Sequence, residues 1–168
     1  EEKILAYLVD FAKKHNLEYK QDKIGNVVIL KPATPGYENR QTTILQSHVD
    51  MVCEKNNDVE HGFFKDPIVT LVEGDWLKAK GTTLGADNGI GVATQLAILA
   101  DNSLEHGPIE ALFTVDEETG LTGAFELADN MLSGSILINL DSEDEGELFI
   151  GCSGGIDSVA EFTYKTVE

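Results

Sequence analysis

The chain has 168 residues, a hydrophobic content of 42% and a formal net charge of −18, from 30 acidic against 12 basic residues. This length fits one domain with a real core, and no apolar run approaches the roughly 20 residues that span a bilayer. The negative charge disfavours nucleic acid and anionic membranes as partners. The two cysteines, Cys53 and Cys152, are too few for a disulfide framework, so they favour a reduced, cytoplasmic setting.

Apolar residues recur at helical spacing in some segments and alternate or cluster as strands in others. In chain order they predict a helix over 2–15, strands over 26–30 and 42–46, a hairpin of strands 68–71 and 76–79, a helix over 88–100, a strand over 109–115, a short helix over 122–127 and strands over 135–140, 147–150 and 159–167. Strands alternating with helices favour an α/β domain, and the hairpin around Gly74 favours a mixed sheet with flanking helices. Because the first helix lacks an N-cap and the last strand lacks a terminator, the chain is predicted to be part of a longer one.

The strand over 42–46 runs into His48-Val49-Asp50. On extended backbone, residues one position apart point to the same side, so His48 and Asp50 are expected to face together. Such a pair can act as a metal ligand and the carboxylate that orients it. The alternative is a capped strand end without a chemical role, which is common for an isolated His-x-Asp.

Asp87 lies in the glycine-rich run from Leu84 to Gly91. The glycines let the backbone approach a site closely, so the carboxylate is a candidate metal ligand. The alternative is that Asp87 is simply the N-cap of the helix that follows it.

Two further acidic sites also follow predicted strands. Glu117 and Glu118 come after the strand over 109–115, and Asp141 ends the strand over 135–140. One of two adjacent carboxylates can bind a metal while its neighbour acts as a general base. The alternative for the glutamate pair is a solvated loop, as we also predict for the acidic residues 143–145.

These acids and one histidine are all expected at the strand ends of an α/β sheet, where such sheets present their ligands. Carboxylates that face one another repel, and a divalent cation between them would offset that repulsion. Nitrogen and oxygen ligands without cysteine suit zinc, manganese or cobalt, and two such metals would activate water for attack on a carbonyl. The sequence has no Gly-x-Ser-x-Gly motif and no phosphate-binding loop to favour another chemistry.

Four segments resemble the dinuclear zinc exopeptidases, the family that includes carboxypeptidases, aminoacylases and carnosinases. The segments are Ser47 to Val52, Gly81 to Gly89, Thr114 to Gly120 and Asn139 to Asp141. The resemblance implies that His48 and Asp141 ligate one zinc, that Asp87 bridges two zincs and that Glu118 ligates the second. It implies that Glu117 is the general base, that Asp50 orients His48 and that the Asp87–Asn88 peptide bond is cis.

Within that family, residues 47–55 and 151–155 are most similar to dipeptidases that cleave before a C-terminal histidine. The resemblance therefore implies a homodimeric parent that hydrolyses small peptides, with cobalt or manganese as possible substitutes for zinc. It implies that 1–155 is the N-terminal part of the catalytic domain and 156–168 the start of a lid. Because the family takes another zinc-binding histidine from further along the chain, these residues alone are expected to be inactive. The alternatives are a tripeptidase, an aminoacylase, a deacylase or a non-catalytic acidic metal-binding module.

Overall fold

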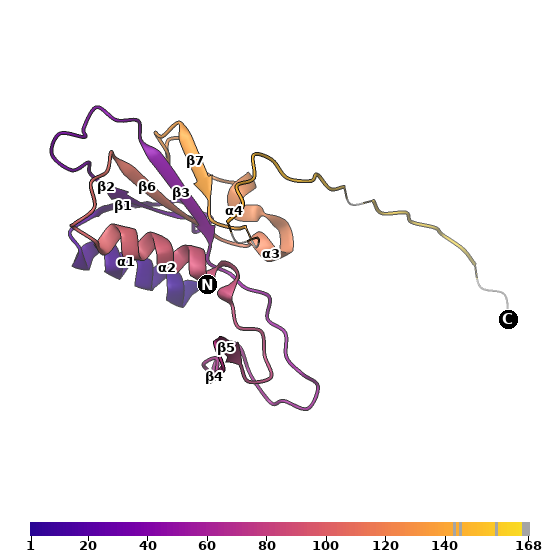
Figure 1. The fold of residues 1–168 in the computed structure, drawn as a ribbon. Helices are drawn as coiled ribbons and strands as arrows, with labels where there is room; N and C mark the ends of the chain where they lie inside the picture. The colour runs from indigo at the N-terminus through magenta and orange to yellow at the C-terminus, as the bar shows by residue number, and fades with distance from the viewer. Residues whose placement is uncertain (143, 145, 157, 166–168) are drawn as a thin grey trace.

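The computed structural model describes residues 1–142, 144, 146–156 and 158–165. A five-stranded sheet in the order β1-β2-β6-β3-β7 forms its centre (Figure 1). In chain order the elements are α1 (Glu2–Lys14), β1 (Glu18–Gln21), β2 (Val27–Lys31), β3 (Thr43–His48), β4 (Thr70–Glu73), β5 (Trp76–Ala79), α2 (Ala86–Ala100), β6 (Ile109–Thr114), α3 (Glu117–Gly120), α4 (Thr122–Phe125) and β7 (Ile136–Asn139).

Helices α1 and α2 lie along one face of the sheet (Figure 1). Their apolar side chains pack on β2 and β6, because each helix carries its apolar residues on one side. The buried members of this core are Leu8, Ala12, Val27, Ile29, Val92, Leu99, Ala111 and Phe113. A smaller cluster of Val28, Ile44, Leu112 and Met131 lies on the opposite face. None of the helices in the described part of the chain is both long and apolar enough to cross a bilayer.

The sheet is mixed, as predicted, but for a different reason. Strands β1, β2 and β6 pair antiparallel, whereas β3 is parallel to both β6 and β7. The hairpin of β4 and β5 is confirmed but forms a separate two-stranded sheet that projects from the body (Figure 1). Strand β1 was not predicted, because its four exposed residues have no apolar face and are held at the edge by pairing with β2.

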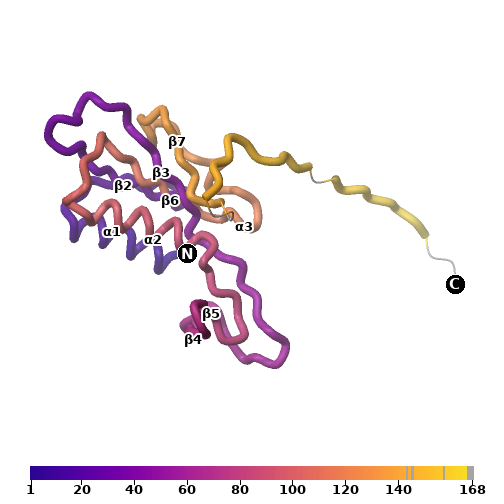
Figure 2. The backbone as a smooth tube through the Cα atoms, viewed as in Figure 1, coloured from indigo at the N-terminus to yellow at the C-terminus, as the bar shows by residue number. Residues whose placement is uncertain are grey.

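Two predicted strands are wrong. Residues 147–150 form no strand, and residues 159–165 form none either. The described residues do not include positions 166 and 167 of the second predicted strand, or positions 143 and 145 of the predicted acidic turn. After β7 the described chain runs away from the sheet (Figure 2), with Ile150 and Phe162 exposed. Alternating apolar residues indicate a strand only where a neighbouring strand is available to pair with it.

A buried asparagine connects the start of β2 to the turn after β6. The Asn26 side-chain oxygen accepts a hydrogen bond from the Val115 N–H at 3.1 Å, and its Nδ2 donates to the Gly123 carbonyl at 2.8 Å. Asn26 is fully buried. It therefore fixes the segment that leads from β6 through α3 to α4, which carries the glutamate pair.

Replacing Gly123 with alanine is expected to destabilise the domain by about 2–3 kcal/mol, because the site is overpacked. A Cβ atom there would lie 2.4 Å from the Val115 carbonyl oxygen and 2.6 Å from the Asn26 side-chain oxygen. Urea unfolding measures the loss. Gly89→Ala is the matched control, since its Cβ would meet nothing within 4 Å. Equal stability of the two variants would contradict the role of this close contact.

Candidate metal centre

The parallel strands β3, β6 and β7 end at the same edge of the sheet. His48 at the end of β3 pairs in register with Thr114 at the end of β6. Gln46 pairs with Asn139 at the end of β7. The side chains that follow these ends therefore meet at one place, and α2 begins at the same edge after the segment that carries the β4–β5 hairpin.

His48 is the centre of the cluster and is only 1% exposed. Its Nε2 lies 3.1 Å from an Asp87 carboxylate oxygen and 3.7 Å from one of Asp141. Its Nδ1 lies 3.2 Å from an Asp50 carboxylate oxygen, so the two residues face together as predicted. Nδ1 thus contacts the Asp50 carboxylate, while Nε2 points at the carboxylates of Asp87 and Asp141, which come from different elements.

Asp50 makes a second contact that the sequence did not predict. Its other carboxylate oxygen accepts a hydrogen bond from the Glu118 backbone N–H at 3.0 Å. One side chain thus contacts both the ring of His48 and the start of α3. Asp50 therefore couples the position of the histidine to that of the glutamate pair.

Asp87 is not the N-cap of α2, so that alternative is wrong. Gly85 occupies the cap position, and Asp87 has non-helical backbone angles within the first turn. The Asp87–Asn88 peptide bond is cis, as expected from the resemblance. The Asp87 side chain is 57% exposed and reaches the His48 ring at the edge of the sheet.

Glu117 and Glu118 open the short helix α3, directly after the turn that follows β6. That turn places Asp116 at a φ of 52°, where its carboxylate accepts hydrogen bonds from the Thr119 and Thr122 hydroxyls. These hydrogen bonds lower the pKa of Asp116. The backbone reversal brings both glutamates to the histidine, whereas on a regular strand they would point to opposite faces.

The charges around His48 favour its protonated form in the metal-free protein. Burial opposes a charge on the ring, but the hydrogen bond with Asp87 and the negative charges of Asp141, Asp50 and Glu117 outweigh it and raise the pKa of His48. A proton on the ring thus partly neutralises the acidic cluster. A bound cation would take over that role and displace the proton.

The carboxylates of the cluster are themselves difficult to ionise together. Burial raises the pKa of Glu117, and the charge of Glu118 adds to the effect while His48 opposes it. Burial and the neighbouring Asp87 raise the pKa of Asp141 to about 6, against the opposing effect of His48. Raised pKa values of this kind are expected where neighbouring carboxylates are not balanced by positive charge.

The donor atoms fit a divalent metal. In one group His48, Asp87 and Asp141, and in a second His48, Glu117 and Glu118, each residue offers one ligand atom, and the atoms of a group all lie within 4.8 Å of one another. Nitrogen and carboxylate donors without a thiolate suit zinc, and also manganese and cobalt. The structure thus brings together all the metal-ligand candidates that the sequence indicated.

A sequence profile of peptidase family M20/M25/M40 matches residues 44–163, which include every residue of the cluster. The chain belongs to this family. It is 55% identical over 157 residues to the cytosol non-specific dipeptidase of Escherichia coli, covering 94% of this chain and 32% of that protein. It therefore spans about a third of the length of that curated relative.

Solved structures of M20-type peptidases share the fold. The aminoacylhistidine dipeptidase of Vibrio alginolyticus matches with a TM-score of 0.84 and 53% identity, over 87% of this chain and 30% of that one. A tripeptidase of Staphylococcus aureus matches with a TM-score of 0.70 and 25% identity, over 86% of this chain and 39% of that one. The predicted α/β class, with a mixed sheet and flanking helices, is thus confirmed.

The sequence interpretation of this M20-family chain missed a residue that connects α2 to β3. Gln95 and Ser47 are both fully buried. With its amide oxygen toward Ser47, Gln95 accepts from the Ser47 N–H at 3.0 Å and donates to the Leu45 carbonyl at 3.2 Å. The contact ties the helix that begins beside Asp87 to the strand that ends at His48. A polar residue on the packing face of an otherwise apolar helix was the signal for it.

Proposed function

We propose that this chain carries most of the metal centre of a zinc peptidase that hydrolyses dipeptides. The observation that supports the proposal best is the convergence of one buried histidine and five carboxylates at the end of the parallel strands. Membership of a peptidase family supports hydrolysis of peptide bonds as the class of reaction. A module that only bound metal would have no use for a carboxylate beyond the ligands, whereas a hydrolase needs a base.

In this proposal His48, Asp87 and Asp141 hold the first zinc. Asp87 also reaches the second, which Glu118 helps to hold, and both residues line one small pocket. Asp50 keeps the His48 ring in place through Nδ1, which leaves Nε2 free to bind the metal. Cobalt or manganese could occupy the same positions.

Zinc in such a site supplies a Lewis acid that polarises the scissile carbonyl and makes water easier to deprotonate. Glu117 accepts the proton from the attacking water and returns it to the nitrogen of the leaving amine. In the metal-free protein burial raises the pKa of Glu117, which is the direction that suits a proton acceptor. Asp50 takes no proton and acts through the histidine.

The substrate that we propose is a dipeptide, with histidine favoured at the C-terminal position. The names of two relatives support the dipeptide, and one of them supports the histidine. The likeness to a tripeptidase keeps a longer peptide as the second candidate. Comparing rates on an Xaa-His dipeptide, a dipeptide without histidine, a tripeptide and an N-acyl amino acid with the full-length protein distinguishes these substrates.

We further propose that residues 1–155 are part of the catalytic domain and that 156–168 begin a second domain. The last described residues run away from the sheet, and Ile156, Val159 and Phe162 are exposed there, which supports placing them outside the catalytic domain (Figure 2). The relatives are about three times as long, so further site residues are expected from the rest of the sequence. We therefore expect these residues alone to bind metal without efficient turnover.

Titration of the metal-free chain with zinc tests the proposed centre. At about pH 7.5 we expect saturable binding with proton release, because metal binding requires unprotonated ligands. Affinity should fall by at least about tenfold at about pH 5.5, since both Asp141, with its pKa of about 6, and His48, with its raised pKa, must lose a proton first. Calorimetry in two buffers of different ionisation enthalpy measures both quantities. Absence of binding by the full-length protein at neutral pH, or an affinity independent of pH, would contradict the proposed ligands. Absence of binding by this chain alone would show that the rest of the sequence is needed to assemble the site.

A further inference from the structure

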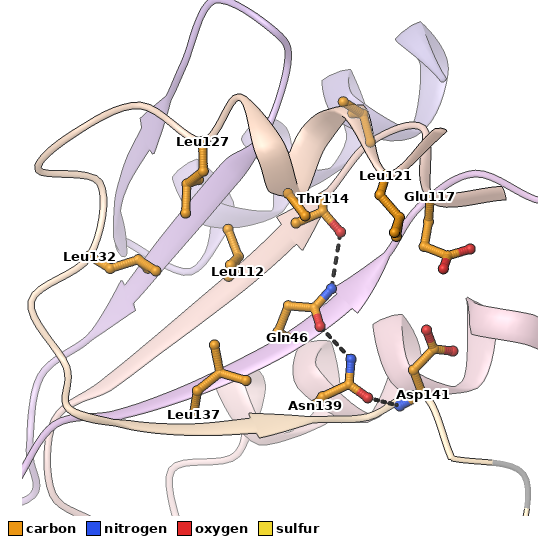
Figure 3. A pocket seen from close by; sticks show the side chains of 12 residues that line it. Gln46, Leu112, Thr114, Glu117, Leu121, Leu127, Leu132, Leu137, Asn139 and Asp141 are labelled. Atoms are coloured by element: carbon orange, nitrogen blue, oxygen red, sulfur yellow. Dashed lines mark hydrogen bonds between the residues drawn. The ribbon is translucent and has the colours of Figure 1, made fainter. Parts of the chain in front are cut away.

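A row of hydrogen-bonded polar side chains crosses three strands beside the metal centre (Figure 3). Gln46 Nε2 donates to the Thr114 hydroxyl oxygen at 3.0 Å, and Asn139 Nδ2 donates to Gln46 Oε1 at 2.5 Å. Asn139 Oδ1 then accepts from the Asp141 backbone N–H at 3.1 Å. The row thus begins at the end of β6 and finishes at a residue of the proposed zinc site.

The surroundings of the row are apolar. It lies in the wall of a pocket of about 340 Å³ that is otherwise lined largely by leucines, among them Leu112, Leu132 and Leu137. Thr114 is buried and Gln46 is half-buried, so their polar groups are costly unless they are paired, whereas Asn139 at the end of the row is exposed. The pocket also has Glu117 and Asp141 at one side (Figure 3).

The direction of each hydrogen bond in the row is set from the Asp141 end. A backbone N–H can only donate, so Asn139 must present its oxygen to Asp141 and its NH₂ group to Gln46. Gln46 must then present its oxygen to Asn139 and its NH₂ group to Thr114. The row therefore has one consistent orientation, and removing Gln46 removes the partner that holds the Asn139 amide in it.

The hydrogen bond from the Asp141 N–H to the Asn139 side chain lies directly after the last hydrogen bond between β3 and β7. The ladder between β3 and β7 ends with the Leu140 N–H donating to the Gln46 carbonyl at 2.8 Å. Within the described residues, the Asp141 N–H has the Asn139 side chain as its acceptor. The asparagine thus closes a tight turn of the kind that Asn side chains favour. That turn directs the Asp141 carboxylate toward His48 Nε2, 3.7 Å away.

We propose that Asn139 is a positioning residue for the metal ligand Asp141, and that Gln46 acts on the same ligand through Asn139. The inference rests on the proposed zinc site. It adds two residues that touch neither metal nor substrate but hold a ligand in the geometry that binding requires. Partners of this kind behind a ligand contribute about ten- to a hundredfold to metal affinity.

Zinc titration of the full-length protein and of its near-isosteric variants tests the inference. Asn139→Leu is expected to weaken zinc binding by about ten- to a hundredfold, and Gln46→Met by less, because the asparagine remains. The double variant is expected to bind no more weakly than Asn139→Leu alone, since the glutamine acts through the asparagine. If the two single changes lower zinc affinity independently, so that their effects add in the double variant, Gln46 does not act through Asn139.

Two controls separate positioning from general destabilisation. Leu112→Ala removes a buried apolar side chain from the same pocket, so it should lower the unfolding temperature and leave zinc affinity unchanged. Thr114→Ser keeps the hydroxyl that receives the Gln46 hydrogen bond and should bind zinc normally, whereas Thr114→Val should bind more weakly. If the unmodified full-length protein binds no zinc, the proposed metal centre fails and this inference fails with it. If the chain binds zinc and Asn139→Leu binds it equally well, only the positioning role is wrong.

Discussion

Asp87→Ala is expected to weaken zinc binding by roughly a thousandfold or more, because the site loses the carboxylate that we propose reaches both metals. Asp87 lies 3.1 Å from His48 Nε2 and has no substitute at the start of α2, where the nearby residues are glycine, alanine and asparagine. The measurement is calorimetric titration of the metal-free chain at neutral pH. Because the side chain is 57% exposed, its removal leaves no buried cavity.

The control for this variant is Asp75→Ala in the exposed turn between β4 and β5, which removes the same charge from the hairpin that projects away from the sheet (Figure 1). It should bind zinc as the unmodified chain does. In Asp87→Ala the pKa of Asp141 should fall, because one of the groups that raises it is gone. Normal zinc affinity in Asp87→Ala would remove Asp87 from the metal site.

Glu117→Gln in the full-length protein is expected to lower kcat on a dipeptide by about a hundred- to ten-thousandfold while zinc content stays near normal. The amide keeps the size of the side chain but cannot accept the proton of the attacking water. Steady-state kinetics and metal analysis of the same preparation measure the two effects.

A matched control is Glu126→Gln, an exposed glutamate that follows α4 on the same segment. It should retain full activity. Loss of zinc from Glu117→Gln would show that this glutamate is a ligand and not the base. Full activity with full metal content would assign the base to another residue.

Segments with a strong pattern were predicted well. α1 carries apolar residues on one side and was found over Glu2–Lys14, and the buried strands β2, β3 and β6 lie where runs of β-branched and apolar residues predicted them. In these segments the residue order itself records which side is buried. The prediction that 147–150 form a strand failed because a short apolar run does not reveal whether a partner strand lies alongside.

The candidate residues were recognised from their position after predicted strands, but their contacts were not. His48 and Asp50 could be expected to face together, since the extended backbone places them on one side. The contact of Asp50 with the Glu118 backbone, the N-terminal turn of α2 and the amide of Gln95 depend on segments far apart in sequence. No local pattern contains that information.

The sequence by itself determined the α/β class, most of the elements and the identity of the acidic and histidine candidates, because burial periodicity and strand-end chemistry are local properties. Tertiary structure alone decided that β6 lies between β2 and β3 and that Gln46 pairs with Asn139. That strand order and register place His48, Asp87 and Asp141 within reach of one another. The physical reason is that a metal site requires side chains from separate elements to share a few ångströms of space, and only the packing of the whole sheet sets those distances.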